Sequence, residues 1–569
     1  MGILQKKLWR LGLVVLAVWL FFFLALDSMV NDSPTMDEQN HLARGAAFVK
    51  TGDPRLSLEH PPLVNSLSGL PLLLLPDLHF PFDHPSWTEQ QPPDVYWYVF
   101  ADQFLWQANQ DVSRMIFLGR LPIVFLTLGL ALVGFHFARE FWGRPSAYLA
   151  FVLLLFEPNI LANGRLVTTD LGGTLFITLA LLLMWRLWAA PGWAWRRWLA
   201  AGAGLGLAFG SKLSMLTFVP ILAVMAVLPL FNAETQRRGG GVHRLVQLGG
   251  AGLVSVLVVW AIFGFEWGMF RFPSETFAFL NRFSGPMPTF WAGIDQIVNV
   301  SRGGRMAFLL GESSDQGFLL FFPVAFLVKT PLVLLVGLLG VVWLGWQRSS
   351  ARPKLLFLFI PVVSYFAVSV ISDINIGYRH LLPILPLVIV GVSGLPTVFD
   401  RSSVANRWRG GDAGHSTAVA LILALGILLP TLWLHPHYLS FFNLAAGGPS
   451  NGASILADSS NDWGQDLLRL QKWMAENGEE TIKLGWFGTA DPAYYGINFE
   501  PLPGFPRADF LALWTNPPFN PENPEPGLYA ISASSLWESH WEAKHVYAWF
   551  REHEPTDRIG YSIYIYDLR

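Results

Sequence analysis

Apolar stretches long enough to cross a lipid bilayer recur along most of this 569-residue chain. A transmembrane helix needs about 20 consecutive, mostly apolar residues, and about eleven stretches approach that length. They lie near residues 8–30, 115–138, 146–163, 167–189, 197–212, 214–231, 246–265, 318–345, 354–372, 379–399 and 416–434. Charged residues make up only 14% of the chain, against about 25% in a typical soluble protein. The sequence therefore predicts a mainly α-helical, polytopic membrane bundle.

Basic residues gather beside alternate ends of these stretches. The first stretch is longer than the apolar part of a usual signal peptide and lacks a small-residue cleavage site, so we expect an uncleaved transmembrane helix with a cytoplasmic N-terminus. The inside segments are then all basic, as the positive-inside rule requires. Their basic residues are Lys6, Lys7, Arg10, Arg139, Arg144, Arg186, Arg196, Arg197, Arg237, Arg238, Arg244, Arg348, Arg352, Lys354, Arg401, Arg407 and Arg409. An odd number of spans places the C-terminal region outside a plasma or inner membrane.

The stretches between and after the spans divide the chain into two predicted domains. Residues 1–434 form the membrane module, with larger outer segments at 31–114 and 266–317. A short apolar run at 63–75 is expected to lie along the membrane interface. Residues 435–569 read as a small extracytoplasmic α/β domain, with a helix beginning before Leu467 and a second over 541–552. Its predicted strands, rich in Ile and Tyr, cover 481–487, 528–532 and 559–566.

Composition excludes several kinds of chemistry. The chain contains no cysteine, which rules out disulfides, thiolate catalysis and cysteine-ligated metal sites. The formal net charge of −3 and the scattered basic groups favour no nucleic-acid partner.

An acidic pair, Asp37-Glu38, follows the first apolar stretch directly. Neighbours on a helix point about 100° apart, so the two carboxylates cannot form one paired site. One is expected to face a cavity as a base, and the other to hold a partner or a metal. Solvated interfacial acids are the alternative.

A second candidate is Glu59-His60, immediately before two prolines. The residue before a proline is pushed to an extended backbone, which makes this a rigid, non-helical turn. Glu59 and His60 could bind a substrate hydroxyl or, together with Asp37, a divalent cation such as Mg²⁺ or Mn²⁺. A purely structural turn remains the alternative.

Three charged residues stand out at the outer ends of membrane stretches, where burial is costly without a partner. Asp170 opens one stretch, and Lys212 interrupts an apolar region that runs from 199 to 230. Arg379 lies at the start of another stretch, and a guanidinium favours bidentate contact with phosphate. Together with Asp37 and Glu59, these residues map to one side of the bilayer. Headgroup contact by a lysine that extends to the interface is the alternative for Lys212.

Several short motifs resemble the GT-C superfamily of membrane glycosyltransferases, nearest to protein O-mannosyltransferase-like (family 39) enzymes and bacterial aminoarabinose transferases. The resemblance covers roughly residues 1–435. It is carried by Asp37-Glu38, by the run 59–63 (Glu-His-Pro-Pro-Leu), by Thr169-Asp170 and by Gly377-Tyr378-Arg379-His380. Relatives often have lysine where this chain has His60. The segments 459–466 and 487–492 are similar to the C-terminal extension of other bacterial members.

This resemblance implies a function. Sugar would move from a polyprenyl-phosphate carrier to a protein, lipid or glycan acceptor, as in a hexosyl- or pentosyltransferase such as a mannosyltransferase. Asp37 would be the base, Glu38 its companion and Asp170 a second acid in the active site. Lys212, Tyr378 and Arg379 would hold the donor phosphate. A multi-pass lipid or sugar transporter is the alternative function, and it requires ionisable residues at the bilayer midplane, where this chain has few.

Overall fold

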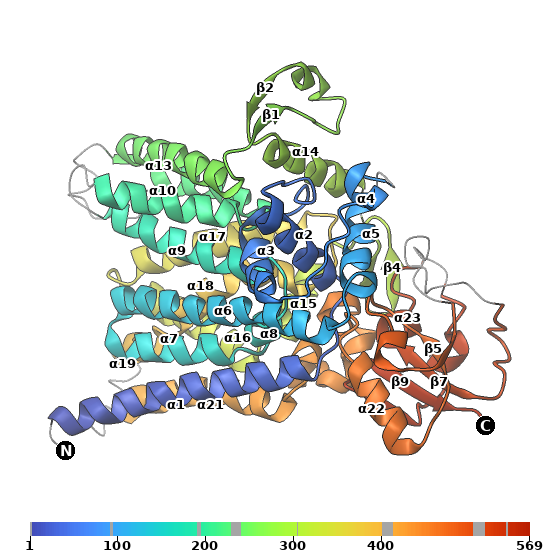
Figure 1. The fold of residues 1–569 in the computed structure, drawn as a ribbon. Coiled ribbons are helices and arrows are strands. Elements are labelled where there is room, and N and C mark those ends of the chain that lie inside the picture. The colour runs from blue at the N-terminus through green and yellow to red at the C-terminus, as the bar shows by residue number, and fades with distance from the viewer. Residues whose placement is uncertain are drawn as a thin grey trace.

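The computed structural model describes residues 3–91, 95–189, 195–228, 240–303, 305–400, 414–503, 518–541 and 544–569. Most of the chain is helical, and the long apolar helices lie side by side in one bundle (Figure 1). The helices of the bundle are α1 (Ile3–Val30), α6 (Val112–Trp142), α7 (Arg144–Phe156), α8 (Pro158–Asn163), α9 (Asp170–Trp188), α10 (Trp195–Phe209), α11 (Phe218–Val227), α13 (Gly240–Ile262), α15 (Phe321–Lys329), α16 (Leu332–Trp346), α17 (Arg352–Val370), α18 (Leu385–Val392), α19 (Leu395–Asp400) and α21 (Gly414–Leu434). The protein is a multi-pass membrane protein.

Fewer helices qualify as full spans than the sequence predicts. Within the described residues, seven are long and apolar enough, or eight if α15 and α16 form one span bent by 105°. Proline explains two of the breaks, because it ends a helix before it or starts a new one. Pro331 separates α15 from α16, and Glu157-Pro158 divides the predicted stretch 146–163 into α7 and α8. The stretches around 197–212 and 214–231 are shortened by the extended Lys212 between them.

Short elements gather at one end of the bundle, the right-hand end in Figure 1. They are α2 (Glu38–Thr51), α3 (Pro62–Gly69), α4 (Pro85–Thr88), α5 (Tyr96–Asp102), α14 (Pro288–Gly303), the strand pair β1 (Trp267–Met269) and β2 (Ser284–Pro286), and the strand pair β3 (Ala307–Leu309) and β4 (Glu312–Ser314). The predicted interfacial run at 63–75 forms α3 and a 3₁₀ turn, η1 (Leu70–Leu74). Two more 3₁₀ turns open membrane helices here: η3 (Leu213–Thr217) and η5 (Tyr378–Ile384).

The C-terminal region lies against the same end and contains a five-stranded sheet in the order β6-β5-β7-β9-β8. The strands are β5 (Ile482–Gly485), β6 (Phe499–Pro501), β7 (Leu528–Ser532), β8 (Asp557–Ile559) and β9 (Ile563–Asp567). Strand β5 is parallel to β6 and β7, whereas β9 is antiparallel to β7 and β8. Alternate residues point to opposite faces, so Ala530 packs with helix α22 (Leu467–Asn477) while Ile531 packs on the other face. The predicted α/β character is confirmed.

Two details of that region differ from the prediction. The predicted strand 559–566 is a hairpin, β8 and β9, that turns at Gly560 with φ +60°. Of the helix predicted over 541–552, residues 542 and 543 lie outside the described residues, and the described part contains only α24 (Ala548–Arg551); a second short helix, α23 (Ala533–Leu536), precedes it. The Glu538 carboxylate accepts a hydrogen bond from the backbone N–H of Val546 at 2.8 Å, which removes that donor from a helix.

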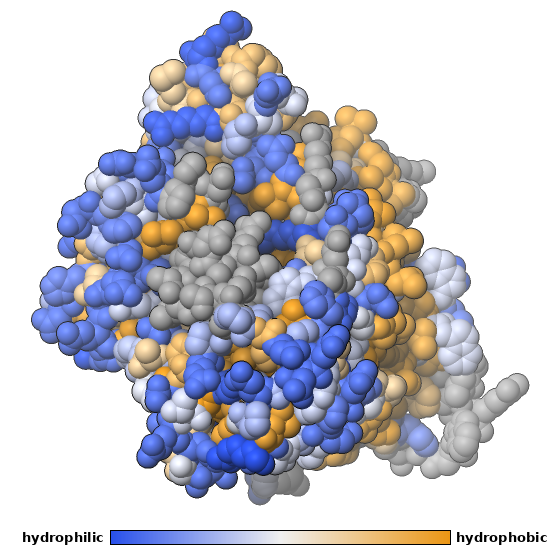
Figure 2. Space-filling model, turned by 90° about the vertical axis from the view of Figure 1, so that its right-hand side faces the viewer, coloured by the Kyte–Doolittle hydropathy of each residue, from blue (hydrophilic) through white to orange (hydrophobic). Residues whose placement is uncertain are grey.

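The end of the molecule and the side of the bundle expose different kinds of residues. Figure 2 looks onto the end and shows mostly hydrophilic residues, while hydrophobic residues gather along the flank that recedes from the viewer. The bundle helices expose many apolar side chains, such as Val336 and Leu339 of α16. This pattern is typical of a membrane protein whose helical bundle faces lipid and whose end faces water.

Candidate active site

One cavity of about 410 Å³ opens where the bundle meets the end elements. Its wall includes six residues that the sequence predicts as site residues: Asp37, Glu59, His60, Asp170, Lys212 and Arg379. They come from the start of α2, the turn before α3, the start of α9, the residue before η3, and η5. Acids and cations separated by up to 342 positions in the chain are therefore neighbours in space.

Asp37 is the N-cap residue of α2, yet its side chain makes no capping hydrogen bond. Its carboxylate instead accepts a hydrogen bond from the Arg379 guanidinium at 2.8 Å. Burial alone would raise the pKa of this carboxyl, but Arg379, with His41 and Arg305 beyond it, holds the pKa below its usual range. Asp37 is thus ionised at neutral pH and faces the cavity.

Arg379 also reaches toward a second acid. Its Nη1 lies 3.8 Å from Oδ2 of Asp170, whose other oxygen pairs with Lys212 Nζ. Lys212 has an extended backbone that separates α10 from η3, which leaves its side chain free to cross to α9. The sequence predicts that a lone lysine here needs an anion, and Asp170 is that anion in the structure. The two cations and two acids form one continuous ionic chain.

Glu59 is the third acid of the cavity wall. It accepts a hydrogen bond from Arg44 of α2 at 3.1 Å, and Arg305 lies 4.0 Å away. Arg305 follows α14 and is the most exposed of these cations, at 44% of its side chain. Tyr98 of α5 also lines the cavity.

Two imidazoles also line the cavity, those of His41 and His60. The rings of His41 and His60 meet edge to face with centroids 4.6 Å apart. His41 Nδ1 lies 3.0 Å from Oδ1 of Asn65, and His60 Nδ1 lies 3.3 Å from the Thr169 hydroxyl. Burial lowers the pKa of His41 to about 4, and burial with the nearby charges of Arg44 and Lys212 lowers that of His60 well below its usual range. Both rings are neutral at pH 7 and can exchange hydrogen bonds with a hydroxyl.

The cavity wall also includes aliphatic side chains. They come from η3, α14 and α17 and are Leu213, Leu216, Ile294, Ile297, Val298 and Val368. A wall with both charged and aliphatic side chains suits an amphiphilic ligand, with a polar head among the ions and a hydrocarbon part among the aliphatic side chains.

Glu38, predicted as a companion of Asp37, lies outside the cavity. Its carboxylate is fully buried and accepts hydrogen bonds from Arg120 at 2.6 and 2.8 Å. It also accepts bonds from the backbone N–H groups of Thr35 and Val167, both at 2.8 Å. The catalytic assignment of Glu38 is therefore corrected, because both of its carboxylate oxygens already accept hydrogen bonds from Arg120 and from the backbone.

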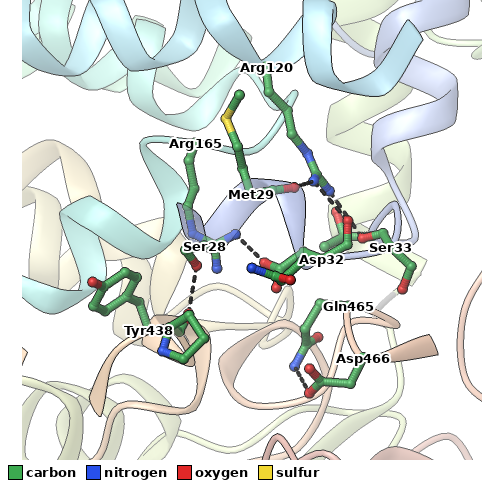
Figure 3. Close-up of polar contacts among 12 residues, drawn as sticks. Ser28, Met29, Asp32, Ser33, Arg120, Arg165, Tyr438, Gln465 and Asp466 are labelled. Carbon is green, nitrogen blue, oxygen red and sulfur yellow. Dashed lines mark hydrogen bonds and ion pairs between the residues drawn. The ribbon is translucent and has the colours of Figure 1, made fainter. Parts of the chain in front are cut away.

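The same arginine holds the chain that leads to Asp37. Arg120 donates to the carbonyl oxygens of Met29, Asp32 and Ser33 at 2.7–3.0 Å. Figure 3 shows Arg120 above this segment and Asp32 between Arg165 and the chain around Gln465. Asp32 pairs with Arg165, so the segment 29–33 is held by charge from the bundle.

Tyr378, predicted at the donor phosphate, also lies outside the cavity. Its ring is buried, and its hydroxyl lies 3.0 Å from the Thr330 hydroxyl at the bend between α15 and α16. A 3₁₀ turn rotates the chain by about 120° per residue, so Tyr378 and Arg379 face different directions. This prediction is corrected as well.

The predicted cation ligands Asp37, Glu59 and His60 share the cavity wall without forming a cluster. The described part of the chain holds no group of three or more acidic or histidine side chains placed to bind a metal ion. Arg379 and Arg44 already occupy the two carboxylates.

Sequence reasoning missed other residues of the wall: His41, Tyr98, Arg305, Tyr365, Ser369 and His380. One of them had a signal. His41 is four residues after Asp37, and such pairs share a helix face. The others come from segments whose position beside Asp37 depends on the tertiary fold.

Comparison with known proteins places part of this chain. The model of a family described as dolichyl-phosphate-mannose-protein mannosyltransferase matches residues 111–264, which run from α6 to α13. The resemblance predicted from the sequence is confirmed by this match. No curated protein matches the chain.

Two solved structures are similar over most of the chain. One is ArnT from Cupriavidus metallidurans bound to undecaprenyl phosphate, with 13% identity, 97% of each chain covered and a TM-score of 0.49. The other is the oligosaccharyltransferase AglB from Archaeoglobus fulgidus in complex with an inhibitory peptide and a dolichol-phosphate. That match has 15% identity, covers 91% of this chain and 61% of AglB, and has a TM-score of 0.47.

Proposed function

We propose that this membrane protein is an inverting glycosyltransferase that moves a sugar from a polyprenyl-phosphate donor to an acceptor hydroxyl at the outer face of the membrane. The observation that carries the proposal is the shared cavity: the Asp37 carboxylate lies 2.8 Å from Arg379, and Lys212 lies beside Asp170 on the same wall. One space thus holds a base for the acceptor and cations for a phosphate. The family match over residues 111–264 supports a donor of the polyprenyl-phosphate class.

In the proposed reaction the acceptor oxygen attacks the anomeric carbon on the face opposite the phosphate. The bond between the anomeric carbon and the phosphate oxygen breaks, and its electron pair leaves with the polyprenyl phosphate. The acceptor proton passes to Asp37 as general base. Arg379 and Lys212 stabilise the charge that develops on the departing phosphate. His41 and His60, as neutral rings, orient the acceptor hydroxyl.

Donor binding would also strengthen the base. A carboxylate held below its usual pKa by Arg379 is a weak proton acceptor. A donor phosphate that takes hydrogen bonds from Arg379 shares the positive charge with Asp37, and the pKa of the carboxyl rises. Asp37 therefore becomes the better base only when the donor is in place.

A panel of purified polyprenyl-phosphate sugars tests the function. The protein in detergent or liposomes should release polyprenyl phosphate from one donor in the presence of a hydroxyl acceptor, measured by mass spectrometry of the lipid. Asp37→Asn should lower this turnover by about 10²- to 10⁴-fold, the range for loss of a general base. The matched control is Asp77→Asn, an exposed aspartate of the same segment, which should retain wild-type turnover. Movement of intact donor between leaflets without loss of sugar would support the transporter instead.

The proposed orientation has its own test, because the chain contains no cysteine. Single cysteines can be introduced at exposed Glu554, beyond α24, and at exposed Ser349, between α16 and α17. A membrane-impermeant maleimide applied to intact cells should label Glu554→Cys and leave Ser349→Cys unlabelled until the membrane is opened. The reverse pattern would refute an outer active site.

A further inference from the structure

The segment 459–466 (Ser-Ser-Asn-Asp-Trp-Gly-Gln-Asp) belongs to the C-terminal region, yet it lies directly behind the cavity. Trp463 is buried, and the centre of its ring lies 4.2 Å from the Arg379 guanidinium carbon. At that distance the face of an indole attracts a cation strongly. The Trp463 ring therefore supports the Arg379 guanidinium, which pairs with Asp37.

Arg379 has few other restraints. Among the described residues its ion-pair partners are Asp37 at 2.8 Å and Asp170 at 3.8 Å, both through Nη1. Its Nε is buried and finds no hydrogen-bond acceptor among the described residues. A guanidinium carries five N–H donors in one plane. If the Trp463 ring fixes that plane, the donors of Arg379 that are not yet paired point in fixed directions.

The backbone of the same segment holds the chain that carries Asp37. The carbonyl oxygen of Trp463 accepts a hydrogen bond from Met36 N–H at 2.9 Å, one residue before Asp37. Two further bonds join Ser33 to the segment: its N–H donates to the Gln465 carbonyl at 3.0 Å, and its hydroxyl donates to the Gly464 carbonyl at 2.8 Å. The loop before α2 is thus paired to residues 463–465 along its length.

The chain that carries Arg379 is held in the same way. The N–H of Tyr378 donates to the Ser460 hydroxyl at 3.1 Å, and the Ser459 hydroxyl donates to the Ile376 carbonyl at 2.5 Å. Gly377 permits this approach, because a Cβ there would lie 2.1 Å from the Ser459 oxygen.

Charge adds a further anchor. Arg469 of α22 lies 2.7 Å from Oδ1 of Asp32, on the far side of the carboxylate from Arg165. Figure 3 shows this region, with Gln465 and Asp466 below Asp32. The C-terminal region therefore closes around the segment that leads to Asp37.

We propose that Trp463 is a positioning residue of the active site: its ring sets the plane of Arg379 and its backbone places the loop of Asp37. The C-terminal region is then part of the catalytic unit and not a separate acceptor-binding module. This inference rests on the proposed function for its effect on turnover, but the contact between Trp463 and Arg379 can be tested without any substrate.

The test uses the full-length protein with Trp463→Leu and Trp463→Phe. The matched control is Trp473→Leu, a partly buried tryptophan of α22 that hydrogen-bonds Asp557, packs on the core of the C-terminal sheet and does not line the cavity. The substrate-free readout is the rate at which phenylglyoxal, an arginine reagent, modifies Arg379, measured on its peptide by mass spectrometry. Loss of a desolvated cation–ring contact should speed this modification about 5- to 30-fold in Trp463→Leu. Trp463→Phe keeps a weaker ring, so we expect about 2- to 5-fold.

The second readout is kcat/KM for the donor as a function of pH. In Trp463→Leu it should fall by about the same 5- to 30-fold, with Trp463→Phe between it and wild type. The acidic limb of the profile should move to higher pH, because Asp37 loses part of the charge that lowers its pKa. The other groups that act on Asp37 or are acted on by it stay in place: His41 of α2, Arg305 after α14, Tyr98 of α5 and Asp458 before the segment.

The outcomes separate the two proposals. Modification of Arg379 at the wild-type rate in folded Trp463→Leu, or in Trp463→Phe if the leucine variant does not fold, overturns the positioning role. Faster modification in a protein whose wild type turns over no polyprenyl-phosphate sugar supports the contact and refutes the glycosyltransferase. Equal losses in Trp473→Leu would mean that any tryptophan of the region matters only for folding, and would also overturn the inference.

Discussion

The neighbouring acids Asp37 and Glu38 should respond to mutation in opposite ways. Glu38→Gln removes a fully buried charge and leaves the Arg120 guanidinium without its carboxylate. Breaking a buried pair by removing one partner costs about 3–5 kcal/mol. The new amide also turns one oxygen into a donor that faces N–H groups of Arg120, Thr35 or Val167. Asp37→Asn, in contrast, changes a side chain on a cavity wall.

The assay separates stability from turnover. Proteins of this size generally unfold irreversibly, so the measurement is the half-life of the folded protein in detergent at one temperature. If the whole loss appeared in the unfolding barrier, 3–5 kcal/mol would shorten the half-life of Glu38→Gln by about two to four powers of ten. Turnover per folded molecule should stay within about tenfold of wild type. Asp37→Asn should keep its half-life and lose about 10²- to 10⁴-fold in turnover.

A double variant sharpens this prediction. Replacing a buried ion pair by apolar residues of similar volume is often neutral or stabilising, whereas removal of one partner is not. Glu38→Leu combined with Arg120→Met should therefore be more stable than either single variant. The reasoning is refuted if Glu38→Gln keeps the wild-type half-life while its turnover falls as far as that of Asp37→Asn.

Three further outcomes follow from the geometry. Arg379→Lys should raise the donor KM by about 10- to 100-fold with little change in half-life, because an ammonium cannot replace a planar guanidinium held between two carboxylates and a ring. Burial alone would raise the pKa of Glu38 and of Asp32, but their arginine partners hold the two pKa values below the usual 4.5 and 3.8. The stability that these carboxylates supply is therefore full above the usual values and is lost as pH falls through the lowered pKa values. Half-lives measured from pH 7 down to pH 3 should shorten only at the acidic end. Gly45→Ala should lower the stability of the folded protein by about 1–3 kcal/mol or more, because its Cβ would lie 1.7 Å from the backbone carbonyl oxygen of Asn65. Gly252→Ala, whose Cβ would have nothing within 4 Å, should leave the half-life unchanged.

Much of the site could be predicted because a membrane confines charged residues to the ends of apolar stretches. Ionisable residues at the ends of apolar stretches are costly without partners, so Asp170, Lys212 and Arg379 had to find one another or a ligand. The same reasoning brought Asp37 and Glu59 to one side of the bilayer. The structure adds which acid meets which cation, and those pairings join positions up to 342 residues apart.

The errors have local physical causes. Periodicity separates Asp37 from Glu38 by direction but cannot say which direction is the cavity. A signal was present, since Thr35 and Glu38 have the spacing of a capping box, in which the glutamate turns back to an N–H three residues earlier. That bond is in the structure at 2.8 Å. Tyr378 was misplaced because its turn is 3₁₀, which the sequence around two prolines does not reveal. The place of Trp463 behind Arg379 depends on how the C-terminal region docks, and no local pattern contains it.

The charges around the cavity explain why one arginine serves both ends of the proposed reaction. Three carboxylates on the cavity wall, those of Asp37, Glu59 and Asp170, are accompanied by three cations, Lys212, Arg305 and Arg379, while burial keeps His41 and His60 neutral. These charges sum to zero, and the phosphodiester of a polyprenyl-phosphate sugar adds one negative charge. Transfer then moves a proton onto Asp37 and one further negative charge onto the phosphate, which leaves the total unchanged. The negative charge only shifts from Asp37 to the leaving group, and a cation placed between them stabilises it at both positions.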